Sequence, residues 1–146
     1  MIVPDVNLLV YAYSSDSRHH IVSKKWFEDL MNGQTVILLP WIVSLSFLRL
    51  MTHRSILEKP MKPSDCFKLV EDWYSYENVR QVDLSMKGRT LMVHLVETYS
   101  PLGNHFYDVY LAALALENRA TLHSNDNDFL RFEEEGLRYM NPLSHR

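Results

Sequence analysis

The sequence predicts an α/β fold in which helices cover a mostly parallel sheet of four to five strands. Short apolar runs rich in branched side chains alternate along the chain with longer stretches of helical periodicity. The chain has 146 residues, 47% of them hydrophobic, which is enough apolar material for one core. Neither a repeat nor a linker interrupts this pattern, so we expect residues 1–146 to form a single domain.

The strands are expected where the apolar runs are short. They cover residues 1–3, 36–39, 79–82 and 120–124, with a possible edge strand over residues 137–140. Pro4 ends the first run, and because proline has no N–H it fits the end of a strand better than its centre.

The longer stretches between these runs are expected to be helices. They cover residues 6–13, 21–31, 41–53, 66–74, 91–99 and 108–116. Asn32-Gly33 is a stop signal for the second helix, and Pro60 and Pro63 separate the third from the fourth, so these two should form a hairpin. The last helix is rich in alanine and almost wholly apolar, which predicts that it is buried.

Composition excludes several classes of protein. A formal charge of −3 argues against binding nucleic acid through bulk positive charge, so any such contact must be local. Cys66 is the one cysteine, so no internal disulfide forms and a structural zinc site is not expected. The first 13 residues carry no basic leader, and no apolar run approaches the roughly 20 residues of a membrane span. We therefore expect a soluble, cytoplasmic protein without membrane contact.

Acidic residues from three segments are expected to meet at one edge of the sheet. Asp5 follows the first strand, and Asp126 and Asp128 follow the fourth. Asp108 lies near the start of the buried helix. Because ligands of open parallel sheets bind beyond the carboxyl ends of the strands, these side chains should line one crevice.

Such a cluster of carboxylates requires a cation. Two like charges about 4 Å apart repel by roughly 4 kcal/mol at an effective dielectric constant near 20. Oxygen ligands without thiolates or a histidine pair suit Mg²⁺, or Mn²⁺, better than zinc. A divalent ion held there activates water for phosphodiester hydrolysis, so we expect Asp5, Asp108 and Asp126 to be catalytic metal ligands, with Asp128 as a further ligand.

Each acidic residue also has a purely structural interpretation. Asp5 could cap the helix that follows it, and Asp108 could favour a helix N-terminus through the dipole. Asp126 and Asp128 could be simple turn formers.

Three polar residues are candidates for supporting roles. Asn7 and Ser124 could support the metal site or could be an ordinary helix-start residue and strand-end hydroxyl. Arg49 could contact the phosphate backbone of a nucleic-acid substrate, or its side chain could reach from an apolar surface to solvent.

These residues resemble the PIN-domain toxins of the VapC type. The likeness rests on five segments in the family's order, namely 5–9, 39–41, 47–52, 108–115 and 124–129. It implies a three-layer α/β/α PIN fold, Mg²⁺-dependent endoribonuclease activity, a homodimer, and an antitoxin encoded beside the toxin. At the matching motif positions, Asp5, Asp108 and Asp126 resemble the family's metal-binding aspartates.

The sequence departs from this family on the third helix. The family usually supplies a glutamate there, and the matching residue here is Ser46. We expect Ser46 on the crevice side, because Leu45, Leu48 and Met51 suit the packed face. Asp128 could partly replace the missing charge.

Two alternative functions compete with the ribonuclease. Because the glutamate is absent, a catalytically weak or inactive PIN fold that binds protein or RNA remains an alternative to the ribonuclease. A haloacid-dehalogenase-like phosphatase also places Asp after its first strand, but Asn7 stands where that class has its second carboxylate, which argues against it.

Overall fold

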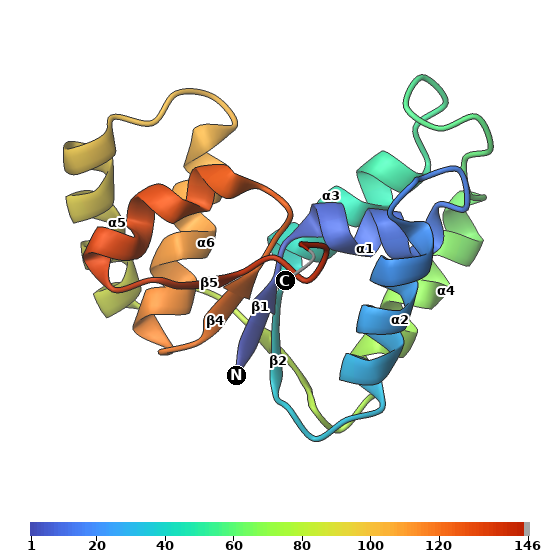
Figure 1. The fold of residues 1–146 in the computed structure, drawn as a ribbon, viewed down its shortest axis with the longest axis horizontal. Helices are drawn as coiled ribbons and strands as arrows, with labels where there is room; N and C mark the ends of the chain where they lie inside the picture. The colour runs from blue at the N-terminus through green and yellow to red at the C-terminus, as the bar shows by residue number, and fades with distance from the viewer. Residues whose placement is uncertain (145–146) are drawn as a thin grey trace.

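A computed structural model describes residues 1–144 and contains a five-stranded sheet. Helices cover both faces of this sheet (Figure 1). The strands are β1 (Ile2–Pro4), β2 (Ile37–Pro40), β3 (Val79–Val82), β4 (Thr121–His123) and β5 (Arg138–Met140). Their order is β3-β2-β1-β4-β5, and every neighbouring pair is parallel. The α/β prediction is confirmed, including the edge strand. Residues 145 and 146, part of the expected single domain, lie outside the described residues.

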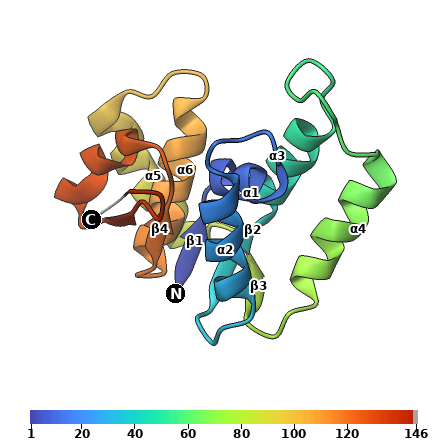
Figure 2. The same cartoon turned by 45° about the vertical axis from the view of Figure 1, so that its right-hand side comes forward.

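The helices are divided between the two faces of the sheet. They are α1 (Val6–Tyr13), α2 (His20–Met31), α3 (Trp41–Met51), α4 (Pro63–Tyr74), α5 (Met86–Tyr99), α6 (His105–Glu117) and the 3₁₀ helix η1 (Asn127–Glu135). Figures 1 and 2 show α1 to α4 on one side, and α5, α6 and η1 on the other. Within residues 1–144, none of the helices combines the length and apolar character that a membrane crossing requires.

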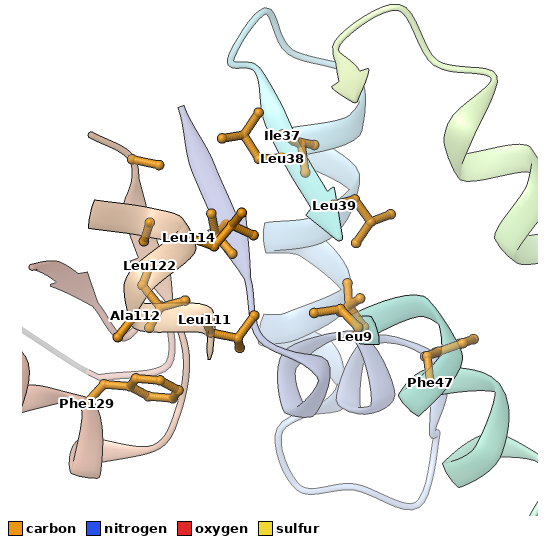
Figure 3. Close-up of a cluster of buried hydrophobic side chains, with 14 of the residues drawn as sticks. Leu9, Ile37, Leu38, Leu39, Phe47, Leu111, Ala112, Leu114, Leu122 and Phe129 are labelled. Atoms are coloured by element: carbon orange, nitrogen blue, oxygen red, sulfur yellow. The ribbon is translucent and has the colours of Figure 1, made fainter. Parts of the chain in front are cut away.

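Buried apolar side chains cover both faces of the sheet and form one core cluster (Figure 3). On the side of α1 and α3, Leu9 and Phe47 lie near Leu39 of β2, and all three side chains are buried. On the other side, Leu111 and Leu114 of α6 lie near Leu122 of β4. Burying a side chain of this size contributes roughly 1.5–3 kcal/mol, so α6 is anchored firmly against the sheet. The expectation that this helix is buried is confirmed.

Strands β1 and β4 lie side by side in the middle of the sheet, but the chain leaves them toward opposite faces. It passes from β1 into α1 and α2, and from β4 into η1 on the other face. A crevice opens at such a point, beyond the carboxyl ends of the two strands. The backbone N–H of Asp5 donates to the carbonyl of His123 at 2.8 Å, which fixes the two strand ends at the crevice.

Candidate active site

Asp5 lies at the base of the crevice, directly after β1. Its side chain is only 5% exposed. The oxygen Oδ1 accepts hydrogen bonds from the backbone N–H of Val6 at 2.7 Å and from the hydroxyl of Tyr107 at 3.0 Å. The hydroxyl of Ser124 donates to Oδ2 at 2.6 Å. Asp5 therefore caps α1 and at the same time joins β1, β4 and α6.

Ser124 connects this carboxylate to the acidic turn after β4. The residue is fully buried, and its Oγ accepts hydrogen bonds from the backbone N–H of Asp126 at 3.0 Å and from Nδ2 of Asn7 at 3.3 Å. With both acceptor positions used, its proton points to Asp5. The other amide atom of Asn7, Oδ1, is buried and has no hydrogen-bond partner within residues 1–144.

Asp108 projects from the first turn of α6, and its side chain is 14% exposed. The nearest cation is Arg131, whose Nη2 lies 3.7 Å from Oδ2. Burial, and then the negative charges of Asp126 and Asp5, raise the pKa of Asp108 to about 6, although Arg131 and His105 act in the opposite direction. The carboxylates are therefore close enough to disfavour one another's ionised form.

Asp5 and Tyr107 titrate in a shared environment. Burial raises the pKa of Asp5 above its ordinary value, and the hydrogen bonds from Ser124, Tyr107 and Val6 oppose that rise. Burial and the charge of Asp5 raise the pKa of Tyr107 in turn, so that its hydroxyl remains a donor.

A cavity of about 300 Å³ opens above these groups. Its acidic wall is formed by Asp108, Asp126 and Asp128. On the α3 side, Ser46 and Arg49 face this wall. The structure thus brings five of the candidate residues to one cavity, and it places Asp5, Asn7 and Ser124 in the hydrogen-bond network at its base.

The structure corrects one expectation about α3. Leu45, expected on the packed face, is 51% exposed, whereas Ser44 is fully buried and its hydroxyl lies 2.6 Å from that of Tyr74. The small serine allows α4 to approach α3, and the turn of the helix then directs Leu45 outward. Ser46 nevertheless lines the cavity, as expected.

Sequence reasoning missed two residues of this site. Tyr107 binds Asp5, and Arg131 is the cation beside Asp108. The position of Tyr107 next to Asp108 was the only signal for the former. Arg131 comes from η1 and stacks over the ring of Phe132 at 4.7 Å, a placement that only the fold reveals.

The donors at this site fit a hard divalent cation in their chemistry. Among residues 1–144, no three His, Cys, Asp or Glu side chains are arranged closely enough to hold a metal ion by themselves. The available donors are carboxylate, amide and hydroxyl oxygens, the ligands that Mg²⁺ and Mn²⁺ prefer. The unpartnered Oδ1 of Asn7 and the mutual repulsion around Asp108 are both features that a bound cation would relieve.

Comparison with known proteins agrees with this fold. The family model of the PIN domain matches residues 2–135. Ribonuclease VapC33 of Mycobacterium tuberculosis is 33% identical over 143 residues, covering 98% of this chain and 99% of the relative. Ribonuclease VapC37 of the same species is 30% identical and covers 97% of each chain.

Solved structures share the fold at lower sequence identity. They include VapC20 of Mycobacterium tuberculosis, a sarcin-ricin loop cleaving toxin, with a TM-score of 0.68, 12% identity and coverage of 90% of this chain and 94% of that one. VapBC2 of Rickettsia felis, bound to a promoter DNA fragment, has a TM-score of 0.65 at 20% identity and covers 97% and 98% of the two chains. This chain therefore belongs to the PIN-domain family and, within it, to the VapC ribonucleases.

Proposed function

We propose that this protein is the toxin of a toxin–antitoxin pair, an endoribonuclease that cleaves RNA phosphodiester bonds with the help of Mg²⁺. The observation that carries the proposal is the environment of Asp108. A half-buried carboxylate, whose pKa is raised to about 6 by partial burial and by the charges of Asp126 and Asp5, lines a cavity that is also lined by Arg49. Perturbed carboxylates in a cleft are typical of sites that bind a cation.

The candidate residues around the cavity each have a role in this proposal. Asp5, Asp108 and Asp126 would hold Mg²⁺ or Mn²⁺, with Asp128 as an additional ligand. When bound, a divalent ion lowers the pKa of water and offsets the charge of a reacting phosphodiester. Ser124 fixes the orientation of Asp5 through the 2.6 Å hydrogen bond, and Arg49 faces the acidic wall where it can pair with a phosphate of the RNA backbone.

The partners in this proposal are RNA, a cognate antitoxin and a second copy of the chain. Two of the structural neighbours are toxin–antitoxin assemblies, VapBC-1 of nontypeable Haemophilus influenzae and a complex from Klebsiella pneumoniae. An antitoxin bound to this chain and a cytoplasmic location, where cellular RNA is available, follow from the same proposal. Light scattering of the purified protein measures whether it forms a homodimer.

A catalytically weak PIN fold that only binds RNA or protein is the second candidate. The observation that favours it is Ser46, a neutral side chain on the cavity wall where the resembling family usually has a glutamate. The two functions differ in one respect that is easily measured, because only the first consumes RNA.

The test compares RNA cleavage by the wild type, by Asp108→Asn and by Asp72→Asn, an exposed aspartate on α4 that serves as the matched control. We expect the wild type and Asp72→Asn to cleave RNA with Mg²⁺ and to stop with EDTA, leaving 5′-phosphate and 3′-hydroxyl ends. Asp108→Asn should be inactive. Cleavage that persists in EDTA, or 2′,3′-cyclic phosphate ends, would contradict the proposed mechanism, and binding without cleavage would favour the second candidate.

A further inference from the structure

We propose that a second cavity, next to the acidic one, binds a single unpaired nucleobase that flanks the phosphate to be cut. The inference rests on the proposed ribonuclease function and adds a specificity site to it. The cavity has a volume of about 530 Å³ and lies between the start of α3, the end of β3 and the start of α6. It is lined by Trp41, Leu45, Asp83, Phe106, Tyr107 and Tyr110, among others.

The two cavities share a wall. Tyr107 lines both of them, and its hydroxyl donates to Asp5 at the base of the acidic cavity. A nucleotide whose phosphate lies in the acidic cavity therefore has its own base, or that of its neighbour, at the mouth of the second cavity. Adjacent nucleotides are the units that two adjoining cavities of this kind can bind together.

The lining of the second cavity suits a flat aromatic ligand. Trp41, Phe106 and Tyr110 contribute rings from two different helices. Phe106 is 45% exposed, a large apolar side chain left in solvent at the entrance. Proteins that bind single-stranded RNA use aromatic side chains of this type, because every base presents a π face on which to stack.

One polar group gives this cavity a preference among bases. Oδ1 of Asp83 accepts hydrogen bonds from the hydroxyl of Tyr110 at 2.7 Å and from the backbone N–H of Leu84 at 2.7 Å. Its other oxygen, Oδ2, accepts no hydrogen bond from residues 1–144, so it is available to a donor on the ligand. Adenine, cytosine and guanine present exocyclic amino groups that donate, whereas uracil has only a ring N–H, flanked by two carbonyl oxygens that a carboxylate repels.

The same carboxylate argues against other occupants. A phosphate would be repelled by the charge of Asp83. The apolar face of a second protein copy would bury that charge without a partner, which is costly. A base with an amino group covers the rings and at the same time satisfies the carboxylate, so it is the occupant that the lining favours.

The test begins by digesting a pool of random-sequence RNA with the purified full chain and Mg²⁺, and by sequencing the cut ends. We expect one position beside the cut to be depleted of uracil with the wild type, and this depletion to disappear in Asp83→Ala. The matched control is Phe67→Ala, which removes an equally exposed phenylalanine, 47% exposed, from α4. Phe67→Ala should retain the wild-type preference.

A second measurement uses one RNA from that pool and its analogue lacking the base at the selective position. Loss of a stacked base should reduce kcat/KM of the wild type about tenfold. Phe106→Ala should lower kcat/KM on the intact RNA by about the same factor. On the abasic RNA its kcat/KM should equal that of the wild type. Phe106→Tyr should retain the wild-type kcat/KM on both RNAs.

Several results would overturn the inference. If Phe106→Ala has the same kcat/KM as Phe67→Ala on the intact RNA, the cavity does not hold a base. The same conclusion follows if Phe106→Ala lowers kcat/KM by equal factors on intact and abasic RNA. If light scattering instead shows that Phe106→Ala alone turns a dimer into monomers, the surface is an interface between copies. A wild type that cuts no RNA rejects the proposed function and this inference together, whereas cleavage without base selectivity rejects only the inference.

Discussion

Asp5 and Asp108 belong to the same candidate site, but the fold holds them in opposite ways. Asp5 accepts hydrogen bonds from Val6, Tyr107 and Ser124, so both of its oxygens are occupied. No N–H or O–H of residues 1–144 donates a hydrogen bond to Asp108, whose partner is the guanidinium of Arg131 at 3.7 Å. The protein supplies donors to both oxygens of Asp5, with one lone pair of Oδ2 left for an ion, and to neither oxygen of Asp108.

The difference follows from the elements that carry the two residues. Asp5 lies where β1 and β4 run side by side, so forming the sheet also forms its hydrogen bonds. Asp108 lies on α6, which is positioned by apolar packing rather than by polar contacts at its first turn. Folding therefore fixes Asp5 completely, and it leaves Asp108 with charge that a cation from solution can compensate.

The largest effect is expected when the network around Asp5 is broken. Asp5→Asn replaces one carboxylate oxygen with an amide NH₂, which can only donate. The three groups that contact the carboxylate are also donors, so the new NH₂ would face a donor instead of an acceptor. Because Ser124 already accepts from Asn7 and Asp126, it cannot accept from the new amide as well. We expect RNA cleavage to fall to background and the free energy of unfolding to fall by about 1–3 kcal/mol, measured by urea denaturation.

Asp108→Asn provides the contrast to this variant. It should also lose cleavage, but removing a charge that burial and two carboxylates disfavour should leave stability in EDTA equal to the wild type or higher. If both variants lose stability to the same extent, the two carboxylates are held alike and the comparison is wrong.

The second effect is a dependence of stability on pH in EDTA. The pKa of Asp108 in the folded protein, about 6, lies above its ordinary value of 3.8, so between these values the folded state binds more protons than the unfolded state. Stability should therefore decrease as the pH rises from about 4 to about 6 and change little from this cause above it. A shift of this size corresponds to at most roughly 3 kcal/mol, and solvent screening reduces it.

Asp108→Asn isolates this contribution, because Asp5, whose pKa is raised as well, remains in the variant. The slope of unfolding free energy against pH in this window should be shallower in Asp108→Asn than in the wild type. Equal slopes would show that Asp108 ionises normally.

The sequence was sufficient to predict the strands and the acidic residues that follow them. β1 and β2 are short apolar runs, which periodicity identifies readily, whereas β3 and β5 also carry polar residues. Asp5 follows the first of these runs directly. The parallel arrangement then places the ends of β1 and β4 together. The site residues themselves remain predictions until their variants are measured.

Other features depend on the fold and leave no pattern in the sequence. The strand order brings Arg131 of η1 to Asp108, although the two residues are more than twenty positions apart. The contact between Ser44 and Tyr74, two residues from different helices, lies on the packed face of α3, whereas Leu45 is exposed. Side-chain pairs between distant segments are decided by packing, which periodicity does not describe.

The third effect is stabilisation by a divalent ion. Because Mg²⁺ or Mn²⁺ would bind the folded state alone, either ion should raise the melting temperature, and the rise should follow the logarithm of the ion concentration once that concentration exceeds the dissociation constant. We expect an increase of a few degrees at millimolar Mn²⁺ for the wild type and a much smaller one for Asp108→Asn, measured by differential scanning fluorimetry. Asp72→Asn should respond like the wild type, and a wild-type curve that does not move with metal would refute the metal site.

The smallest effect is expected at Ser46, on the α3 wall opposite the carboxylates. Its hydroxyl contributes an oxygen but no charge. The proposed metal site therefore has one carboxylate fewer than a site with a glutamate at position 46 would have. Ser46→Glu adds attraction for the ion when metal is present and adds repulsion toward Asp108 and Asp126 when it is absent. The variant should therefore need several-fold less Mg²⁺ for half-maximal cleavage and should melt a few degrees lower in EDTA.

The two changes must appear together, because both follow from placing one more negative charge in the cavity. Ser64→Glu, which adds the same charge to an exposed position at the start of α4, is the matched control and should alter neither the Mg²⁺ requirement nor the melting temperature in EDTA by as much. If Ser46→Glu lowers stability without changing the Mg²⁺ requirement, the glutamate repels the carboxylates but does not reach the ion. If both quantities match the Ser64→Glu control, Ser46 lies too far from the carboxylates to act on the metal, and the assignment of the α3 wall to the site is wrong.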